Sequence, residues 1–279
     1  MKLQPEQISA IVSLLSDHDP DIAASLRQKL HGSGESIVRE ILQACEKGSR
    51  AHREVSRVLM RFREPSLEMR FRNLTLTELG DIALEEGVFA LARFGYPDLD
   101  ESAYKTRLGY MAFELAPRVA PDDHPIRIIR TLNHYLFDEQ GFHAPGHYDP
   151  DDTYLNCVLD RKRGWPITLS AVYLILAQRL ELPIVGVGLP NRYIVKYTDN
   201  GQDIFIDPYN RGQILTANEC GDLIGATLSD DLFRVATNRS TLFRMMLNLR
   251  NTYLSLNNQN KTKKLESLMS IIQSDLTDF

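Results

Sequence analysis

The chain has 279 residues, a formal net charge of -5 and 43% hydrophobic residues. This length suits two or three small units with buried cores. The negative net charge argues against nonspecific electrostatic binding to nucleic acid. Three scattered cysteines without a C-x-x-C pair predict reduced thiols. Because no apolar run has the length of a signal peptide or a membrane helix, we expect a cytoplasmic protein without a membrane partner.

Residues 1–64 are predicted to form four short helices arranged as two pairs. Asp19 can cap the second helix, and Pro20 suits its first position, where a missing N–H does no harm. Helix pairs joined by such turns are typical of HEAT-like repeats. Because two pairs leave an apolar face open, we expect this face to dock on the next domain and the repeats to bind a protein partner.

A run of arginines crosses the end of this segment. Its members are Arg50, Arg53, Arg57, Arg61, Arg63, Arg70 and Arg72, and they lie among Glu54, Glu64 and Glu68. Alternation of the two charges predicts a solvated helix face, and phosphate binding is the alternative interpretation.

The next helix is expected at residues 77–94, with a capping-box start in Thr75-Leu76-Thr77-Glu78. Glu85 and Glu86 are adjacent and therefore point about 100° apart on a helix, which indicates a charged flank and not a catalytic pair. Further helices are predicted over 101–115 and 125–137, followed by a loop over 141–150.

From Tyr154 the pattern predicts a short helix that stops at Gly164, then a strongly apolar helix over 168–180. Strands are expected at 184–189, 192–198 and 204–207, with Asn200-Gly201 as a hairpin turn. The predicted fold class is α+β, mostly helical, with one buried helix packed on a small antiparallel sheet. After residue 238, a helix hairpin turns at 257–260 and has these apolar positions on its first helix: Leu242, Met245, Met246, Leu249 and Leu254.

Several short motifs together resemble the SirB1 family of bacterial proteins, which has a transglutaminase-like (papain-like) core. They are Tyr154-Leu155-Asn156, Val158-Leu159-Asp160-Arg161, Gly164-Trp165-Pro166-Ile167-Thr168-Leu169-Ser170, Gly186-Val187-Gly188-Leu189-Pro190 and Phe205-Ile206-Asp207-Pro208-Tyr209-Asn210. The resemblance spans nearly the whole chain. It implies HEAT-like repeats over 1–64, the core over 65–235 and a tetratricopeptide-like hairpin over 236–279, and no cofactor.

Thiol enzymes of the transglutaminase-like type need a Cys at a helix N-terminus, a His on a strand and an Asp on the next strand. The resemblance implies that Arg192 occupies the His position and Asp207 the Asp position, and Pro166-Ile167-Thr168 contains no Cys. No histidine follows residue 147. A guanidinium stays protonated and cannot act as a base, so the sequence predicts an inactive triad.

The sequence contains other candidate nucleophiles and metal ligands. Cys157 is a remote nucleophile candidate, and its alternative role is that of a small buried apolar residue. Thr168 and Ser170 have no evident base, which favours capping or packing. His143 and His147, with Asp149, Asp151 and Asp152 nearby, are possible metal ligands. A metal site is not predicted there, because Ala-Pro-Gly between the two histidines breaks a helical face.

For Arg192 and Asp207 we expect a structural salt bridge, since neighbouring strands bring side chains within about 5 Å. The alternative is a pocket for an anion or carboxylate, in which the Arg192 guanidinium binds the anion through two N–H donors. Its neighbours in that pocket would be Asp207, Asn210, Tyr209 and Trp165. An inactive interaction or regulatory module is thus the expected function. The alternative is an unconventional amide hydrolase or acyltransferase in the same cleft.

Overall fold

The computed structural model describes residues 3–16, 19–63, 66–76, 80–120, 123–146, 149–199, 202–225 and 230–273. Contacts divide the chain into a unit of residues 1–66 and a unit of residues 67–279. The further boundary at residues 235 and 236 stays a prediction. Among the described residues, no helix combines the length and the apolar character needed to cross a bilayer.

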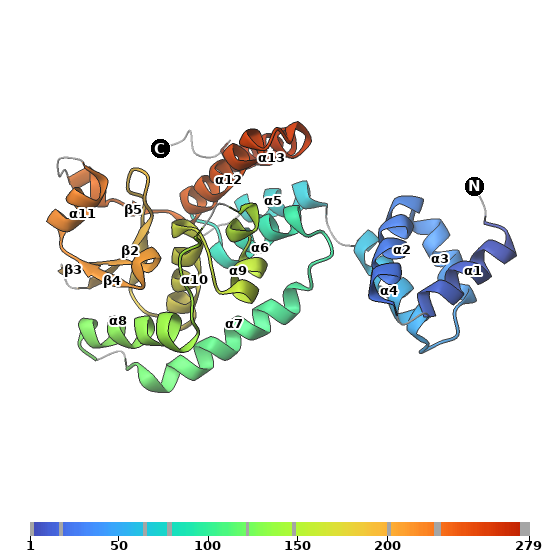
Figure 1. The fold of residues 1–279 in the computed structure, drawn as a ribbon, viewed down its shortest axis with the longest axis horizontal. Coiled ribbons are helices and arrows are strands. Elements are labelled where there is room, and N and C mark those ends of the chain that lie inside the picture. Colours follow the sequence, from blue (N-terminus) through green and yellow to red (C-terminus); the bar gives the residue numbers. More distant parts are fainter. Residues whose placement is uncertain are drawn as a thin grey trace. The chain divides into compact units, whose positions relative to one another are not determined.

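The first unit consists of helices, as predicted. They are α1 (Pro5–Ser16), α2 (Pro20–Ser33), α3 (Glu35–Ala44) and α4 (Arg50–Arg63) (Figure 1). Asp19 caps α2 through a hydrogen bond of 2.8 Å from the amide of Asp21, which confirms the predicted cap. Each helix packs against the others around a shared cluster that includes Leu15, Ile41 and Val55. The apolar stripes therefore close on a core of their own.

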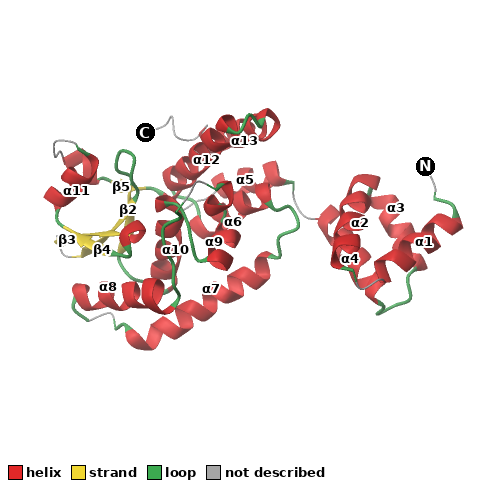
Figure 2. Cartoon of the chain, in the orientation of Figure 1, coloured by secondary structure: helices red, strands yellow, loops and turns green. Residues whose placement is uncertain are grey.

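Helices surround the sheet of the second unit, which Figure 2 shows as a small group of strands. Its first helices are α5 (Leu67–Thr75), α6 (Leu84–Gly95), α7 (Glu101–Leu115) and α8 (Pro125–Asn133), and α8 continues into a π-helical turn at His134–Glu139. Then follow α9 (Leu155–Arg161) and α10 (Pro166–Arg179), and after the sheet α11 (Ala217–Ile224), α12 (Asn238–Ser255) and α13 (Gln259–Gln273). The mostly helical α+β class is confirmed.

The sheet has the strand order β4-β3-β2-β1-β5 and is antiparallel throughout its described pairs. Its strands are β1 (Ile184–Val187), β2 (Ile194–Asp199), β3 (Gln202–Asp207), β4 (Gln213–Leu215) and β5 (Val235–Ala236). Side chains alternate between its faces: Val195 and Ile206 join the core around α10, whereas Ile194 and Phe205 join a second cluster that includes Cys220 of α11. The sheet is thus covered on both faces. The predicted turn at Asn200-Gly201 lies outside the described residues.

Some local predictions were wrong. Thr75 ends α5 and α6 begins only at Leu84, while 77–79 lie outside the described residues. The reason is Asp81, whose carboxylate accepts hydrogen bonds from the amides of Asn238 (2.6 Å) and Arg239 (3.0 Å). Its segment therefore anchors the start of α12 and does not extend α6.

Three further details also differ from the sequence predictions. Lys162 in the left-handed conformation (φ 59°) ends α9, not Gly164. Leu254 is 52% exposed, while the other predicted apolar positions of α12 are buried. The arginine run is solvated at Arg53 and Arg57, but Arg70 is half-buried in an ion-pair network.

Gly186 of β1 makes room for a buried tyrosine. A Cβ at this position would lie 2.1 Å from the hydroxyl oxygen of Tyr193, which is 2% exposed and hydrogen-bonded to Thr241 at 2.6 Å. We expect Gly186→Ala to lower the free energy of unfolding by about 2 kcal/mol through overpacking, measured by urea denaturation. Gly32→Ala is the control, because nothing lies within 4 Å of its added Cβ. Equal stability of the two variants would contradict the packing argument.

Candidate functional site

The start of α10 is the segment for which the sequence resemblance implies the position of a nucleophile. Trp165 is the N-cap residue and Pro166 the first helical residue, followed by Ile167 and Thr168. Thr168 is fully buried, and its hydroxyl donates to the carbonyl of Thr153 at 3.5 Å. Ser170 is also fully buried and donates to the carbonyl of Tyr193 at 3.3 Å. These hydroxyls join backbone segments, which confirms the packing interpretation.

Arg192 and Asp207 form the predicted salt bridge. Nη2 and Nε of Arg192 lie 2.5 and 3.2 Å from Oδ2 of Asp207, whose side chain is fully buried while that of Arg192 is 18% exposed. Asp207 also accepts from the amide of Tyr209 and from Nδ2 of Asn210, each at 3.0 Å. The Arg192 guanidinium stacks 4.6 Å from the centre of the Tyr209 ring. A buried carboxylate is thereby neutralised and fully hydrogen-bonded.

The Arg192 backbone is held from outside the sheet. Nη2 of Arg244 on α12 donates to the carbonyls of Leu189 (2.6 Å) and Arg192 (2.9 Å). The Arg244 guanidinium also lies 5.6 Å from the centre of the Tyr193 ring, and burial lowers its pKa below the ordinary value for arginine. A second guanidinium therefore lies next to Arg192, the position that the sequence resemblance implies for the base.

A pocket of about 320 Å³ opens beside this pair at the start of α10, and we term it the cleft pocket. Its lining comprises Thr153, Trp165, Pro166, Ile167, Asn191, Arg192, Tyr193, Arg244, Asn248, Asn251 and Thr252. These described residues include neither a cysteine, nor a histidine, nor a carboxylate. Of the predicted ligand-binding residues, Arg192 and Trp165 line the pocket. Asp207 and Tyr209 contact Arg192, and Asn210 donates to Asp207.

Cys157 does not line the cleft pocket. It lies on α9 with 6% exposure, and Nδ2 of Asn156 is 3.5 Å from its sulfur. Burial raises the pKa of its thiol, even though a hydrogen bond from Tyr96 acts in the opposite direction. The neutral thiol is a poor nucleophile, so Cys157 has the features of a small buried core residue.

The acidic loop residues pair with arginines. Arg161 donates to Asp149 (2.9 Å) and Asp151 (2.6 Å), and Nε of Arg163 donates to fully buried Asp152 at 2.8 Å. Nδ1 of His143 lies 3.0 Å from the carbonyl of Gly141, and His147 is outside the described residues. Within the described part of the chain, no group of three or more His, Cys, Asp or Glu side chains is placed to hold a metal ion.

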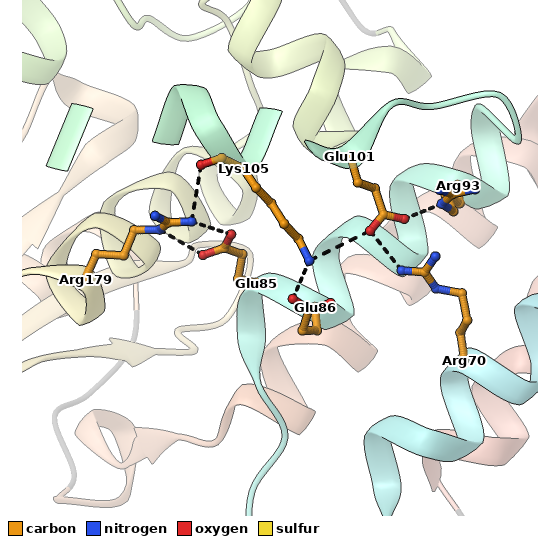
Figure 3. A network of polar contacts seen from close by, with 7 residues as sticks. All are labelled: Arg70, Glu85, Glu86, Arg93, Glu101, Lys105 and Arg179. Atoms are coloured by element: carbon orange, nitrogen blue, oxygen red, sulfur yellow. Dashed lines mark hydrogen bonds and ion pairs between the residues drawn. The ribbon is translucent and has the colours of Figure 1, made fainter. Parts of the chain in front are cut away.

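Glu85 and Glu86 belong to separate ion pairs, as their interpretation as a charged flank requires. Glu85 binds Arg179 of α10 at 2.7 Å, while Glu86 binds Lys105 of α7 (Figure 3). Lys105 also lies 3.9 Å from Glu101, which binds Arg70 and Arg93. This network ties α5, α6, α7 and α10 together.

Sequence comparison assigns the family. The sequence model of the Transglutaminase-like superfamily matches residues 102–247, more than half of the chain, and the chain belongs to this superfamily. The matched segment contains the start of α10, Arg192, Asp207 and Arg244.

Curated relatives are similar over part of their length. The chain is 30% identical over 179 residues to a UPF0162 protein of Xylella fastidiosa (strain 9a5c), which covers 60% of this chain and 63% of that protein. It is 29% identical over 133 residues to F-box only protein 21 of Homo sapiens, covering 44% of this chain and 21% of that protein. The chain thus spans less than two thirds of the Xylella relative. No solved structure matches.

Proposed function

We propose that this chain is a transglutaminase-like protein that has lost thiol catalysis and acts as a protein-interaction or regulatory module. The observation that carries the proposal is the Arg192–Asp207 ion pair at the positions expected for base and acid. A guanidinium remains protonated at any usable pH, so it cannot remove a proton from a nucleophile. The motifs around Trp165 and Asp207 further support membership of the SirB1 branch, with a bacterial, cytoplasmic setting.

The cleft pocket is proposed to bind a carboxylate. Arg192 uses Nε and Nη2 for Asp207, and its Nη1 makes no hydrogen bond to a described residue. Arg244 uses Nη2 for two carbonyls, and its Nε and Nη1 make none to that part of the chain. Two arginines that line one pocket, with no carboxylate in its described lining, suit an anionic group. A carboxylate at the end or on the side chain of a partner peptide has this chemistry.

The test is a calorimetric titration of the full chain with the dipeptide N-acetyl-Ala-Ala and with its C-terminal amide. We expect the acid to bind about tenfold more tightly or better, because a hydrogen-bonded charge is worth about 1.5–3 kcal/mol. Arg244→Gln should remove this preference, whereas Arg250→Gln, on the same helix but outside the pocket lining, should keep it. Equal affinity for the dipeptide acid and its C-terminal amide would contradict the proposal that the cleft pocket binds a carboxylate.

Loss of catalysis is tested separately from ligand binding. Incorporation of a fluorescent amine into a glutamine-containing protein should stay at background for the wild-type chain and for Cys157→Ser alike. Activity that disappears in Cys157→Ser would instead support the unconventional acyltransferase. Because this assay does not depend on Arg244, its outcome is distinguishable from that of the titration.

The helices of residues 1–66 are proposed to dock the protein partner. They form a core of their own, and Arg53 and Arg57 on α4 are exposed. A photo-crosslinking group at Arg53 should capture the partner in cells more strongly than one at exposed Asp222 of α11. Equal capture from both positions would contradict this assignment.

A further inference from the structure

The outward side of α7 carries two large aromatic side chains that the core does not use. Tyr110 and Phe113 are 68% and 76% exposed, more than any other aromatic side chain in the described part of the chain. The opposite side of the helix, with Leu108, Met111 and Leu115, is buried in the core. In Figure 1, α7 forms an edge of the second unit. An apolar patch left open beside a complete core indicates a surface that binds a macromolecule.

The spacing of the exposed residues on this side suits a second helix. Their positions are Ala103, Thr106, Tyr110, Phe113 and Pro117, which lie alternately three and four residues apart and are all exposed. Such spacing places side chains along one line of a helix and is the pattern at which two helices pack side by side. We term the surface of these five residues the outer face of α7.

The two flanks of the outer face differ in charge and size. Arg107 and Glu114 lie on one flank, seven residues and therefore about two helical turns apart. Ser102, Gly109 and Ala116 lie on the other flank. The small neutral residues allow a second backbone to approach closely, while the charged residues select its direction.

An antiparallel copy of the same helix brings the opposite charges together. In a two-fold antiparallel pair, like flanks meet with the chain direction reversed, so Arg107 of each copy lies opposite the partner's Glu114. The same register places Tyr110 of each copy against the partner's Phe113. A parallel pair would instead place the charged flank against the small neutral flank. The outer face is thus complementary to itself in charge and in apolar character when the helices are antiparallel.

Both charges can take a second partner. Arg107 binds Asp160 at 3.0 Å, and Glu114 accepts a hydrogen bond from the hydroxyl of Tyr135 at 2.7 Å. A guanidinium has five N–H donors and a carboxylate has about four acceptor positions, so each group keeps capacity for a further contact. The neighbouring Arg118 is already paired with a carboxylate of its own chain.

We propose that the outer face of α7 binds the outer face of α7 in a second copy of this chain, antiparallel about a two-fold axis. Aromatic side chains bury about 150–250 Å² each, so two Tyr–Phe contacts and their neighbours come near the lower end of specific interfaces, about 1,200 Å². A small interface of this kind gives a weak dimer with a micromolar dissociation constant. The inference does not depend on the function proposed for the cleft pocket, whose lining includes no residue of α7.

Sedimentation equilibrium of the full chain, from micromolar to sub-millimolar concentration, tests for the dimer. We expect a reversible monomer–dimer equilibrium whose dissociation constant rises at least about tenfold in Phe113→Ser, because each dimer loses two buried rings. Leu76→Ser is the control, since Leu76 is 79% exposed and lies outside α7. A monomer at every concentration, or equal dissociation constants for the two variants, overturns the proposal.

Charge reversal tests the antiparallel register. Arg107→Glu alone places two glutamates opposite each other, and Glu114→Arg alone places two arginines opposite each other, so each variant should dimerise about tenfold more weakly or worse. An equal mixture of the two variants should dimerise about as well as the wild type, because each flank contact then joins a glutamate to an arginine. Absence of any gain on mixing overturns the antiparallel pairing.

A single variant keeps this test decisive if Glu114→Arg fails to fold after Tyr135 loses its acceptor. Arg250→Glu reverses the charge of an arginine that also belongs to an ion pair but lies on α12, so it is the matched control for Arg107→Glu. Circular dichroism verifies that both variants are folded. A weaker dimer in Arg107→Glu than in Arg250→Glu supports the proposed contact, and equal dissociation constants overturn it.

Discussion

Replacement of Arg192 by alanine is expected to lower the free energy of unfolding by about 3–5 kcal/mol, because it leaves the buried Asp207 carboxylate without a compensating charge. The Asp207 side chain is fully buried, and Arg192 supplies its compensating cation through Nε and Nη2. The amide of Tyr209 and Nδ2 of Asn210 remain as donors, but neither carries a charge. Urea denaturation near neutral pH, followed by far-UV circular dichroism, measures the difference.

The control for this prediction is a second substitution at the partner. Arg192→Ala with Asp207→Asn removes both charges, and it should recover most of the lost stability. Arg211→Ala is the matched surface variant, since Arg211 and Asp138 have side chains that are 59% and 51% exposed, and it should cost about 1 kcal/mol or less. If Arg192→Ala behaves like Arg211→Ala, the pair does not stabilise the adjoining ends of β2 and β3.

The central layer of the fold could be predicted from the sequence because its signals are local. Thr168 to Leu180 is apolar on every side, as expected for a helix buried between a sheet and other helices, and α10 is buried along most of its length. Short β-branched segments after Pro183 indicated the strands. The pairing of β2 with β3 brings Arg192, two residues before β2, within reach of Asp207 at the end of β3. Where alternation and neighbour pairing carry the information, prediction and structure agree.

The composition of the pockets could not be predicted, because distant segments build them. Arg244 and Asn248 reach the cleft pocket from α12, more than fifty residues beyond Arg192, and no motif links the two segments. Asn156 lines a pocket whose other walls come from the α6–α7 junction. The start of α6 was missed for a similar reason, since Asp81 is bound to the amides of Asn238 and Arg239. Tertiary contacts override local capping signals at such positions.

Substitution of Glu101 by glutamine is expected to lower the free energy of unfolding by about 3 kcal/mol. Glu101 begins α7 with 11% of its side chain exposed and binds Arg70 at 2.9 Å and Arg93, whose side chains are 20% and 14% exposed. Glutamine keeps the size but not the charge, so these guanidinium groups lose their compensating carboxylate (Figure 3). Glu266→Gln, on an exposed pair with Arg250, should change stability by about 1 kcal/mol or less.

The pH dependence of this difference identifies its electrostatic origin. Burial alone would raise the pKa of Glu101, but the hydrogen bonds and charges of Arg93 and Arg70 lower it below the ordinary value of 4.5. Because the carboxylate binds its proton less readily in the folded than in the unfolded chain, its stabilisation is complete above 4.5 and is lost as pH falls through the folded-state pKa. The gap between wild type and Glu101→Gln should therefore be constant near neutral pH and shrink in acid. If the difference in free energy of unfolding between wild type and Glu101→Gln does not change below pH 4.5, glutamine acts by disturbing the packing of α7. The charge of Glu101 would then contribute little to joining α5, α6 and α7.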